Sequence, residues 1–189
     1  IKGEIEFQNV HFKYNDEDSA ILNGVSFKIR AGEKIALLGP TGAGKSTIIS
    51  LLMRFYEPAN GIIKIDGRDI REYARPFLRS KIGVVLQKPF LFSTTIKENI
   101  AYSDPEMHIE EIVESAQVAH IHDIITDIFP QAYETVVGEK GVTLSGGQKQ
   151  RVTLARTILK NPDILVLDDS TSSVDTETEF EIQKALRDV

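Results

Sequence analysis

Eight residues near position 40 have the types and the spacing that bind phosphate groups. They read Gly39-Pro40-Thr41-Gly42-Ala43-Gly44-Lys45-Ser46 and fit the pattern G-x-x-x-x-G-K-[ST]. Glycines let a loop wrap closely, so that successive N–H groups point inward at phosphate oxygens. In this pattern Lys45 supplies the charge for the β- and γ-phosphates of a nucleotide, and the Ser46 hydroxyl is a ligand for Mg²⁺.

A carboxylate stands at the end of the most apolar strand that the sequence predicts. Asp168 follows the run Ile-Leu-Val-Leu at 164–167. Because Mg²⁺ keeps several of its waters, we expect Asp168 to hold the ion through water. By itself such an aspartate could equally start the next turn, and only its pairing with the phosphate loop favours the metal role.

A second glycine-rich turn, Leu144-Ser145-Gly146-Gly147-Gln148, contains no lysine. A hydroxyl, glycine N–H groups and a helix N-terminus can also hold an anion. Three interpretations remain open for this turn: a second anion site, half of a shared site, or an N-cap serine followed by a flexible turn.

The elements that must position these motifs alternate between strands and helices. The sequence predicts strands at 35–38, 62–65, 82–86 and 164–167, after a strand-rich start. It predicts helices at 45–55, 95–100 and 110–119, from the second glycine turn to 159, and from 176 onward. This alternation indicates an α/β fold with a parallel sheet covered by helices on both faces.

The composition sets further limits. With 189 residues, 41% apolar and 26% charged, the chain suits one globular domain. The net charge of -6 argues against a nucleic-acid binder, and the absence of cysteine excludes a disulfide scaffold and a thiol nucleophile. The chain starts with Ile1 and its last predicted helix reaches Val189 without a cap, so we expect a truncated piece of a longer protein.

Taken together, the motifs resemble the ATP-binding cassette (ABC) family, whose signature is Leu-Ser-Gly-Gly-Gln. The resemblance to the nucleotide-binding domain of an ABC exporter covers essentially all of the chain, in family order. It implies a P-loop NTPase core with a mainly parallel sheet, an N-terminal antiparallel β subdomain and a helical subdomain that carries the signature. Residues 1–189 would form one such domain, truncated at the C-terminus, with the helical subdomain at approximately 90–150.

The resemblance assigns roles residue by residue. Tyr14 matches the aromatic residue that stacks on adenine, and Gln87 matches the Q-loop glutamine, which ligates Mg²⁺ and senses a transmembrane domain. Asp169 and Gln87 match the catalytic positions, and Ser46, Gln87 and Asp168 the metal ligands. The residues implied to contact ATP are Tyr14, Gly39, Pro40, Thr41, Gly42, Ala43, Gly44, Lys45, Ser46, Thr47, Ser145, Gly146, Gly147 and Gln148. Residues 135–139 resemble the exporter-type segment before the signature, and 172–175 resemble the D-loop.

The implied mechanism needs a partner. Two nucleotide-binding domains would pair head to tail, with each ATP between the phosphate loop of one chain and the signature of the other. Ser145 and Gly147 would then contact the γ-phosphate of the partner's ATP. Closure on ATP would drive transport through a transmembrane domain, with this domain at the cytoplasmic face of the cell membrane and no nucleic acid involved.

Two features depart from the family pattern. Asp169 stands where the family usually has glutamate, and a side chain one methylene shorter is expected to orient the attacking water poorly. The family's switch histidine lies beyond residue 189, and the histidines of this chain stand elsewhere: His11, His108, His120 and His122. A weakened site beside an intact signature is the combination expected of one half of a heterodimeric exporter.

Three functional hypotheses follow. The first is a transport ATPase domain, and the second is a regulatory nucleotide-binding module, which Asp169 favours for the chain's own site. The third is a soluble ABC ATPase of DNA repair or chromosome organisation. It predicts a long coiled-coil insertion before the signature or a basic face, and the sequence has neither.

Overall fold

The computed structural model describes residues 1–15, 19–138, 143–168 and 176–185. The backbone divides into two compact units, Ile1–Ile82 and Gly83–Val189. Within the described ranges, no helix is long and apolar enough to cross a membrane.

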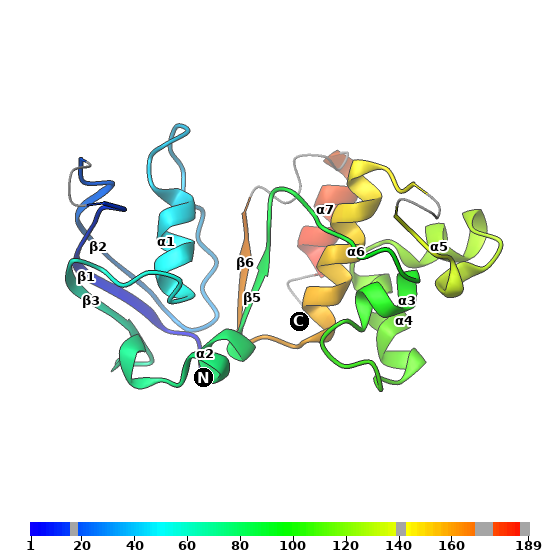
Figure 1. The fold of residues 1–189 in the computed structure, drawn as a ribbon, viewed down its shortest axis with the longest axis horizontal. Coiled ribbons are helices and arrows are strands. Elements are labelled where there is room, and N and C mark those ends of the chain that lie inside the picture. Colours follow the sequence, from blue (N-terminus) through cyan, green and yellow to red (C-terminus); the bar gives the residue numbers. More distant parts are fainter. Residues whose placement is uncertain (16–18, 139–142, 169–175, 186–189) are drawn as a thin grey trace. The chain divides into compact units, whose positions relative to one another are not determined.

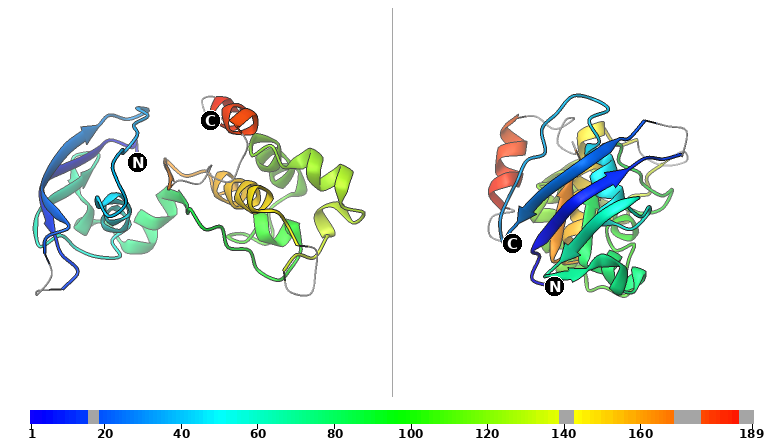
Figure 2. Two further views of the ribbon diagram at one scale, coloured as in Figure 1. Left: turned by 90° about the horizontal axis from the view of Figure 1, so that it is seen from above. Right: turned by 90° about the vertical axis from the view of Figure 1, so that its left-hand side faces the viewer.

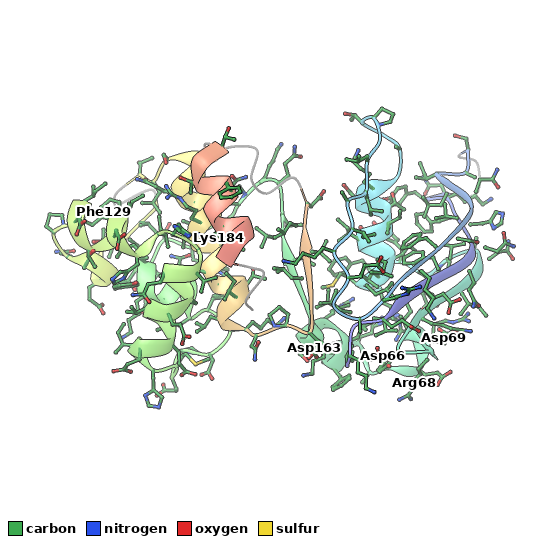
Figure 3. The ribbon with its side chains drawn as sticks, turned by 180° about the vertical axis from the view of Figure 1, so that it is seen from behind. Asp66, Arg68, Asp69, Phe129, Asp163 and Lys184 are labelled. Carbon is green, nitrogen blue, oxygen red and sulfur yellow. The ribbon has the colours of Figure 1, made fainter. Side chains whose placement is uncertain are left out.

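The first unit is built on a four-stranded antiparallel sheet in the order β2-β1-β3-β4 (Figures 1 and 2). Its strands are β1 (Ile5–Phe12), β2 (Leu22–Ile29), β3 (Asn60–Ile65) and β4 (Arg68–Asp69). Figure 3 shows Asp66, Arg68 and Asp69 together at the hairpin that joins the last two strands.

A β-bulge in β1 decides which side chains enter the core of this unit. Ile5 and Phe7 are buried before the bulge, Val10 and Phe12 after it, so the buried set changes from odd to even positions. Asn9 has a left-handed φ of 49°, and the pairing register shifts on both neighbouring strands. An inserted residue is what shifts a period-two pattern by one position.

Helix α1 (Lys45–Leu52) lies between β2 and β3 in the chain and buries Thr47, Leu51 and Leu52. The predicted extension of this helix to residue 55 is wrong. Arg54 adopts a left-handed φ of 51°, and the Arg79 guanidinium binds the carbonyls of Met53 and Arg54. Two carbonyls that follow the helix end are thereby satisfied by a residue distant in the chain. The unit ends with the short helices η1 (Ile70–Glu72) and α2 (Arg75–Lys81).

The buried strand predicted at 35–38 is also wrong. These residues form no strand, and Ile35, Leu37 and Leu38 are 46%, 39% and 91% exposed. A strand needs a hydrogen-bonded neighbour, and the described part of the sheet, in which β2 is an edge, pairs none of its strands with this run.

The second unit contains a two-stranded sheet, β5 (Ile82–Val85) and β6 (Ile164–Leu167), which starts at the boundary between the units. The two strands run in the same direction (Figure 1). Strands and helices alternate as predicted, but the larger of the two described sheets is antiparallel, which the alternation did not predict.

Helices make up most of the second unit. They are α3 (Ile96–Ile100), α4 (Ile109–Val118), α5 (His122–Ile128), η2 (Ala132–Glu134), α6 (Gly146–Leu159) and α7 (Thr176–Ala185). Their core includes fully buried isoleucines on α3, α4, α5 and the turn before α5: Ile96, Ile100, Ile112, Ile121 and Ile125. Helix α6 packs against α3 and α4, so the turn at its start is carried by a firmly packed helix.

Candidate functional site

The loop at 39–44 has the backbone of a phosphate cradle. Gly42 and Gly44 have left-handed φ values of 85° and 88°. The left-handed backbone at Gly44 strains any other residue, and a Cβ atom there would also lie 2.7 Å from Leu22 Cδ2, so glycine is favoured at this position. Gly44 is also the N-cap of α1, and because it has no side chain it makes no side-chain cap to the helix.

Lys45, the only cation of the loop motif, folds back over the loop. Lys45 Nζ donates hydrogen bonds to the carbonyls of Gly39, at 2.7 Å, and Pro40, at 3.0 Å. These bonds hold the loop curled and place the ammonium beside the exposed loop backbone. An ammonium group has three donors, so an arriving anion meets a positive charge and the uncapped N-terminus of α1 at one place.

Tyr14 lies against the start of the same helix. Its hydroxyl is 3.2 Å from the Oγ1 of Thr47, which is only 5% exposed. The Tyr14 ring stands edge-on to Phe12 and to Tyr56, at centroid distances of 4.9 and 5.2 Å. The ring itself is half-exposed, so one face can receive a flat apolar group while its neighbours fix its tilt.

The structure adds a contact that the sequence did not predict. The hydroxyl of Thr47, a residue predicted to contact ATP, pairs with the Tyr14 hydroxyl, and its ATP contact stays a prediction. Tyr56 was not predicted at all. Its only sequence signal is that it follows Phe55 shortly after the helix, which does not distinguish it from an ordinary surface aromatic.

Gln87 and Asp168 lie just after the carboxyl ends of the two strands of the small sheet. Gln87 follows β5 and is exposed, and its carbonyl accepts a hydrogen bond from Gln150 Nε2 at 3.4 Å. Asp168 follows β6, and its N–H donates to Val85 O at 2.9 Å. Asp163, labelled in Figure 3, precedes β6 and marks its opposite end. Carboxyl ends of parallel strands are where open α/β sheets bind ligands.

Part of the predicted machinery lies outside the described residues. Asp169, the D-loop at 172–175 and Glu139 belong to that part of the chain. The predicted metal ligands are divided between the units, with Ser46 in the first and Gln87 and Asp168 in the second. In the residues that are described, no three His, Asp or Glu side chains gather in a metal-binding group.

The second glycine turn is capped by its own side chains. Ser145 is the N-cap of α6, and its hydroxyl accepts from Gln148 N–H at 3.2 Å. Gln148 Oε1 in turn accepts from Ser145 N–H at 2.9 Å, which completes a capping box. Ser145 is therefore an N-cap, but α6 begins directly at Gly146, where that interpretation expected a flexible turn, and the two anion-site interpretations stay predictions. The Ser145 hydroxyl still has its own proton to donate, and Gly146 and Gly147 begin the helix with their N–H groups.

Comparison with known proteins identifies the family. A model described as ABC transporter matches residues 22–172. The "Putative multidrug export ATP-binding/permease protein YgaD" of Bacillus subtilis (strain 168) is 52% identical over 186 residues, which are 98% of this chain and 32% of that protein. The mouse "ATP-binding cassette sub-family B member 6" is 53% identical over 188 residues, covering 100% of this chain and 22% of the relative.

A solved structure gives the same answer in three dimensions. It is entitled "Structure of a bacterial Atm1-family ABC exporter with ATP bound" and is 48% identical, with a TM-score of 0.93. The match covers 99% of this chain and 33% of the exporter chain, so the sequence spans about a third of such a protein or less. On the family match, the ordered motifs and the shared fold, this chain belongs to the ABC transporter family and has the P-loop NTPase fold of an ABC ATPase.

Proposed function

We propose that this chain is the ATP-binding and ATP-hydrolysing motor domain of a membrane ABC exporter. The observation that carries the proposal is the loop at 39–44, where Lys45 and the N-terminus of α1, which has no side-chain cap, lie at one stretch of loop backbone. The names of the relatives favour the motor over a purely regulatory module, since they are exporters and ATP-binding proteins of transporters.

ATP would be bound mainly through its phosphates. The backbone from Gly39 to Ser46 would surround them, with Lys45 moving its hydrogen bonds from the loop carbonyls to the β- and γ-oxygens. The half-exposed ring of Tyr14 would stack on adenine. Stacking contributes on the order of 1 kcal/mol and does not read the identity of the base, so most of the affinity comes from the triphosphate.

The residues proposed for Mg²⁺ suit that ion. Ser46, Gln87 and Asp168 offer a hydroxyl, an amide and a carboxylate oxygen, which is the oxygen chemistry that Mg²⁺ prefers, and so few protein ligands leave room for waters and phosphates. When bound, the ion would neutralise charge on the transferred phosphoryl group. Asp169 would orient the attacking water, less effectively than glutamate at that position.

The turn at Ser145 is proposed to serve a second domain. Its hydroxyl proton and the N–H groups of Gly146 and Gly147 can donate to an anion, but the turn itself brings no cation. It therefore suits a phosphate whose charge is already balanced elsewhere, such as the γ-phosphate held by the loop of a partner. Asp169 favours a partner that differs from this chain, in a heterodimer at the cytoplasmic face of the cell membrane.

The domain organisation follows from the same proposal. Residues 1–189 would be one nucleotide-binding domain that continues beyond Val189, with residues of about 90–150 as its helical subdomain. The antiparallel sheet of the first unit would be its β subdomain.

The decisive experiment measures Mg²⁺-dependent ATP hydrolysis by the full-length protein, alone and with its partner chain. We expect the wild-type protein to hydrolyse ATP. Lys45→Ala should suppress hydrolysis in the chain's own site, and Asp169→Glu should increase its rate. The 189-residue chain alone should bind ATP but turn it over very slowly. If the full-length protein binds ATP no more tightly than its Lys45→Ala variant, the proposed function is wrong.

A further inference from the structure

The segment that follows Gln87 is fastened to α6 at two points. Gln150 donates its side-chain amide to the carbonyl of Gln87, at 3.4 Å. Further along the same helix, Arg156 Nη1 donates to the carbonyl of Phe90, at 3.0 Å. Both residues therefore hold the backbone of the segment from 87 to 92, and both belong to the helix that Ser145 begins.

Asn99 extends the second attachment. Arg156 donates to Asn99 twice, through Nε to the backbone carbonyl at 2.6 Å and through Nη2 to Oδ1 at 2.9 Å. The fully buried Asn99 side chain then binds Phe92 in both directions: Oδ1 accepts from Phe92 N–H at 2.9 Å, and Nδ2 donates to Phe92 O at 3.0 Å. One planar guanidinium thus fixes the path of the chain from Phe90 to Phe92.

The charged guanidinium of Arg156 lies in a partly apolar environment. Its guanidinium lies over the rings of Phe92 and Tyr102, 5.7 and 5.8 Å from their centroids, and these two rings stack at 4.3 Å. Burial lowers the pKa of the Arg156 guanidinium, but an arginine stays charged in a protein. Backbone carbonyls and ring faces therefore stabilise this cation, and they do so only while the segment stays in place.

Gln150 is a poor choice for stability alone. It is 2% exposed, and its Oε1 has no hydrogen-bond donor among the described residues. A buried acceptor without a donor destabilises a fold, whereas an apolar side chain of the same shape would not. Its amide contact with the carbonyl of Gln87 is the feature that a methionine could not supply.

We propose that Gln150 and Arg156 are positioning residues, which hold the Gln87 segment on α6 so that Gln87 and the Ser145 turn move as one body. The inference rests on the proposed function. It links the residue proposed to ligate Mg²⁺ in the chain's own site to the turn proposed to contact the partner's ATP. A shift of α6 that releases Ser145 from one nucleotide would then withdraw Gln87 from the other.

The test uses the full-length protein with two variants. Gln150→Met keeps shape and burial but removes the amide, and Arg156→Lys keeps the charge but cannot bind Phe90 and Asn99 together. We would measure thermal unfolding, amide hydrogen exchange of residues 87–92, and kcat and KM for MgATP. Arg151→Lys is the control for exchange, because Arg151 lies on the same helix and reaches the carbonyls of His120, at 2.8 Å, and Gly147, at 3.4 Å, instead of the segment from 87 to 92.

For Gln150→Met we expect an unchanged or higher Tm together with faster exchange at 87–92. The kcat should fall on the order of tenfold, as for one lost hydrogen bond to a functional segment, with KM within about twofold. Arg156→Lys should speed exchange at Phe92, whereas Arg151→Lys should speed it near His120 and Gly147 but not at 87–92. The proposal is wrong if Gln150→Met has the wild-type exchange rate at 87–92 and the wild-type kcat. If Arg156→Lys does not fold, the result for Gln150→Met alone decides the test.

The two proposals fail in different ways. If the wild-type protein neither binds nor hydrolyses ATP, the proposed function is wrong, yet the exchange measurement still shows whether Gln150 and Arg156 hold the segment. If hydrolysis is normal and exchange at 87–92 does not respond to either variant, only the positioning role is wrong.

Discussion

The two glycine turns of this protein open helices in opposite ways. The loop before α1 has left-handed glycines, no side-chain cap and Lys45 folded over its carbonyls. The turn before α6 has no left-handed glycine and no cation, and the Ser145 and Gln148 side chains satisfy its end through a capping box. The start of α1 has no side-chain cap, whereas the capping box of α6 satisfies part of that helix's own N–H groups.

This difference indicates which of the two glycine turns can bind an anion without a partner chain. At α1 an anion gains a charge partner and the helix dipole at a helix start that has no side-chain cap. At α6 it would gain donors, but the guanidinium at this turn, Arg151, already donates to the carbonyls of Gly147 and His120, and the helix is already stable without an anion. The first turn is therefore suited to bind a polyphosphate, and the second to complete a site whose charge is supplied by another chain.

The largest expected effect tests the cation that separates the two turns. Lys45→Ala should weaken ATP binding by on the order of 10- to 100-fold, because hydrogen bonds to charged groups contribute about 1.5–3 kcal/mol. Equilibrium binding of a fluorescent ATP analogue measures this, with Lys64→Ala on β3 as the control. An affinity within about twofold of wild type would show that the loop is not the phosphate site.

Adding one methyl group to each turn should have opposite effects on stability. Gly44→Ala places a Cβ atom on a backbone that is already left-handed and brings it close to Leu22. It should lower the free energy of unfolding by about 1–3 kcal/mol. Gly147→Ala lies in regular helix and should raise it, by up to about 0.8 kcal/mol. Chemical denaturation gives both values, and equal losses in the two variants would remove the contrast between the turns.

Removal of the cap should destabilise α6 without affecting the chain's own ATP site. Ser145→Ala is expected to cost about 1 kcal/mol of folding stability, the usual effect of losing an N-cap hydroxyl. Thr95→Ala is the matched variant, because Thr95 caps α3 through the same kind of box with Glu98. Both should lower the Tm alike, but only Ser145→Ala should slow hydrolysis in the paired protein. A loss of ATP affinity in Ser145→Ala alone would contradict this division of roles.

The smallest expected effect concerns the ring beside the first turn. Tyr14→Ala should weaken ATP binding by about fivefold, equivalent to about 1 kcal/mol of stacking, and equally for GTP. Tyr14→Phe keeps the ring but loses the bond to Thr47, so it should cost about half as much. Competition binding with both nucleotides measures this, and a selective loss for ATP would point to base-specific contacts instead.

Much of the site could be predicted because its decisive features are local. The glycine at 44 and the serine at 145 set the backbone within a residue or two, so the helices begin at Lys45 and Gly146 as the sequence predicts. Other elements have weak local signals. Helices α2 and α5 have only seven residues each, which is too short for a clear apolar period, and they were not predicted.

The sequence by itself determined the family, the phosphate loop and the starts of the two helices, since glycine freedom, helix capping and motif spacing act over a few residues. Only the tertiary structure decided that α1 ends at Leu52, just before the two carbonyls that Arg79 binds, and that Thr47 pairs with Tyr14. It alone revealed Gln150 at the carbonyl of Gln87, 63 positions away in the chain. Contacts of this kind depend on the path of the backbone between distant residues, which no local preference specifies.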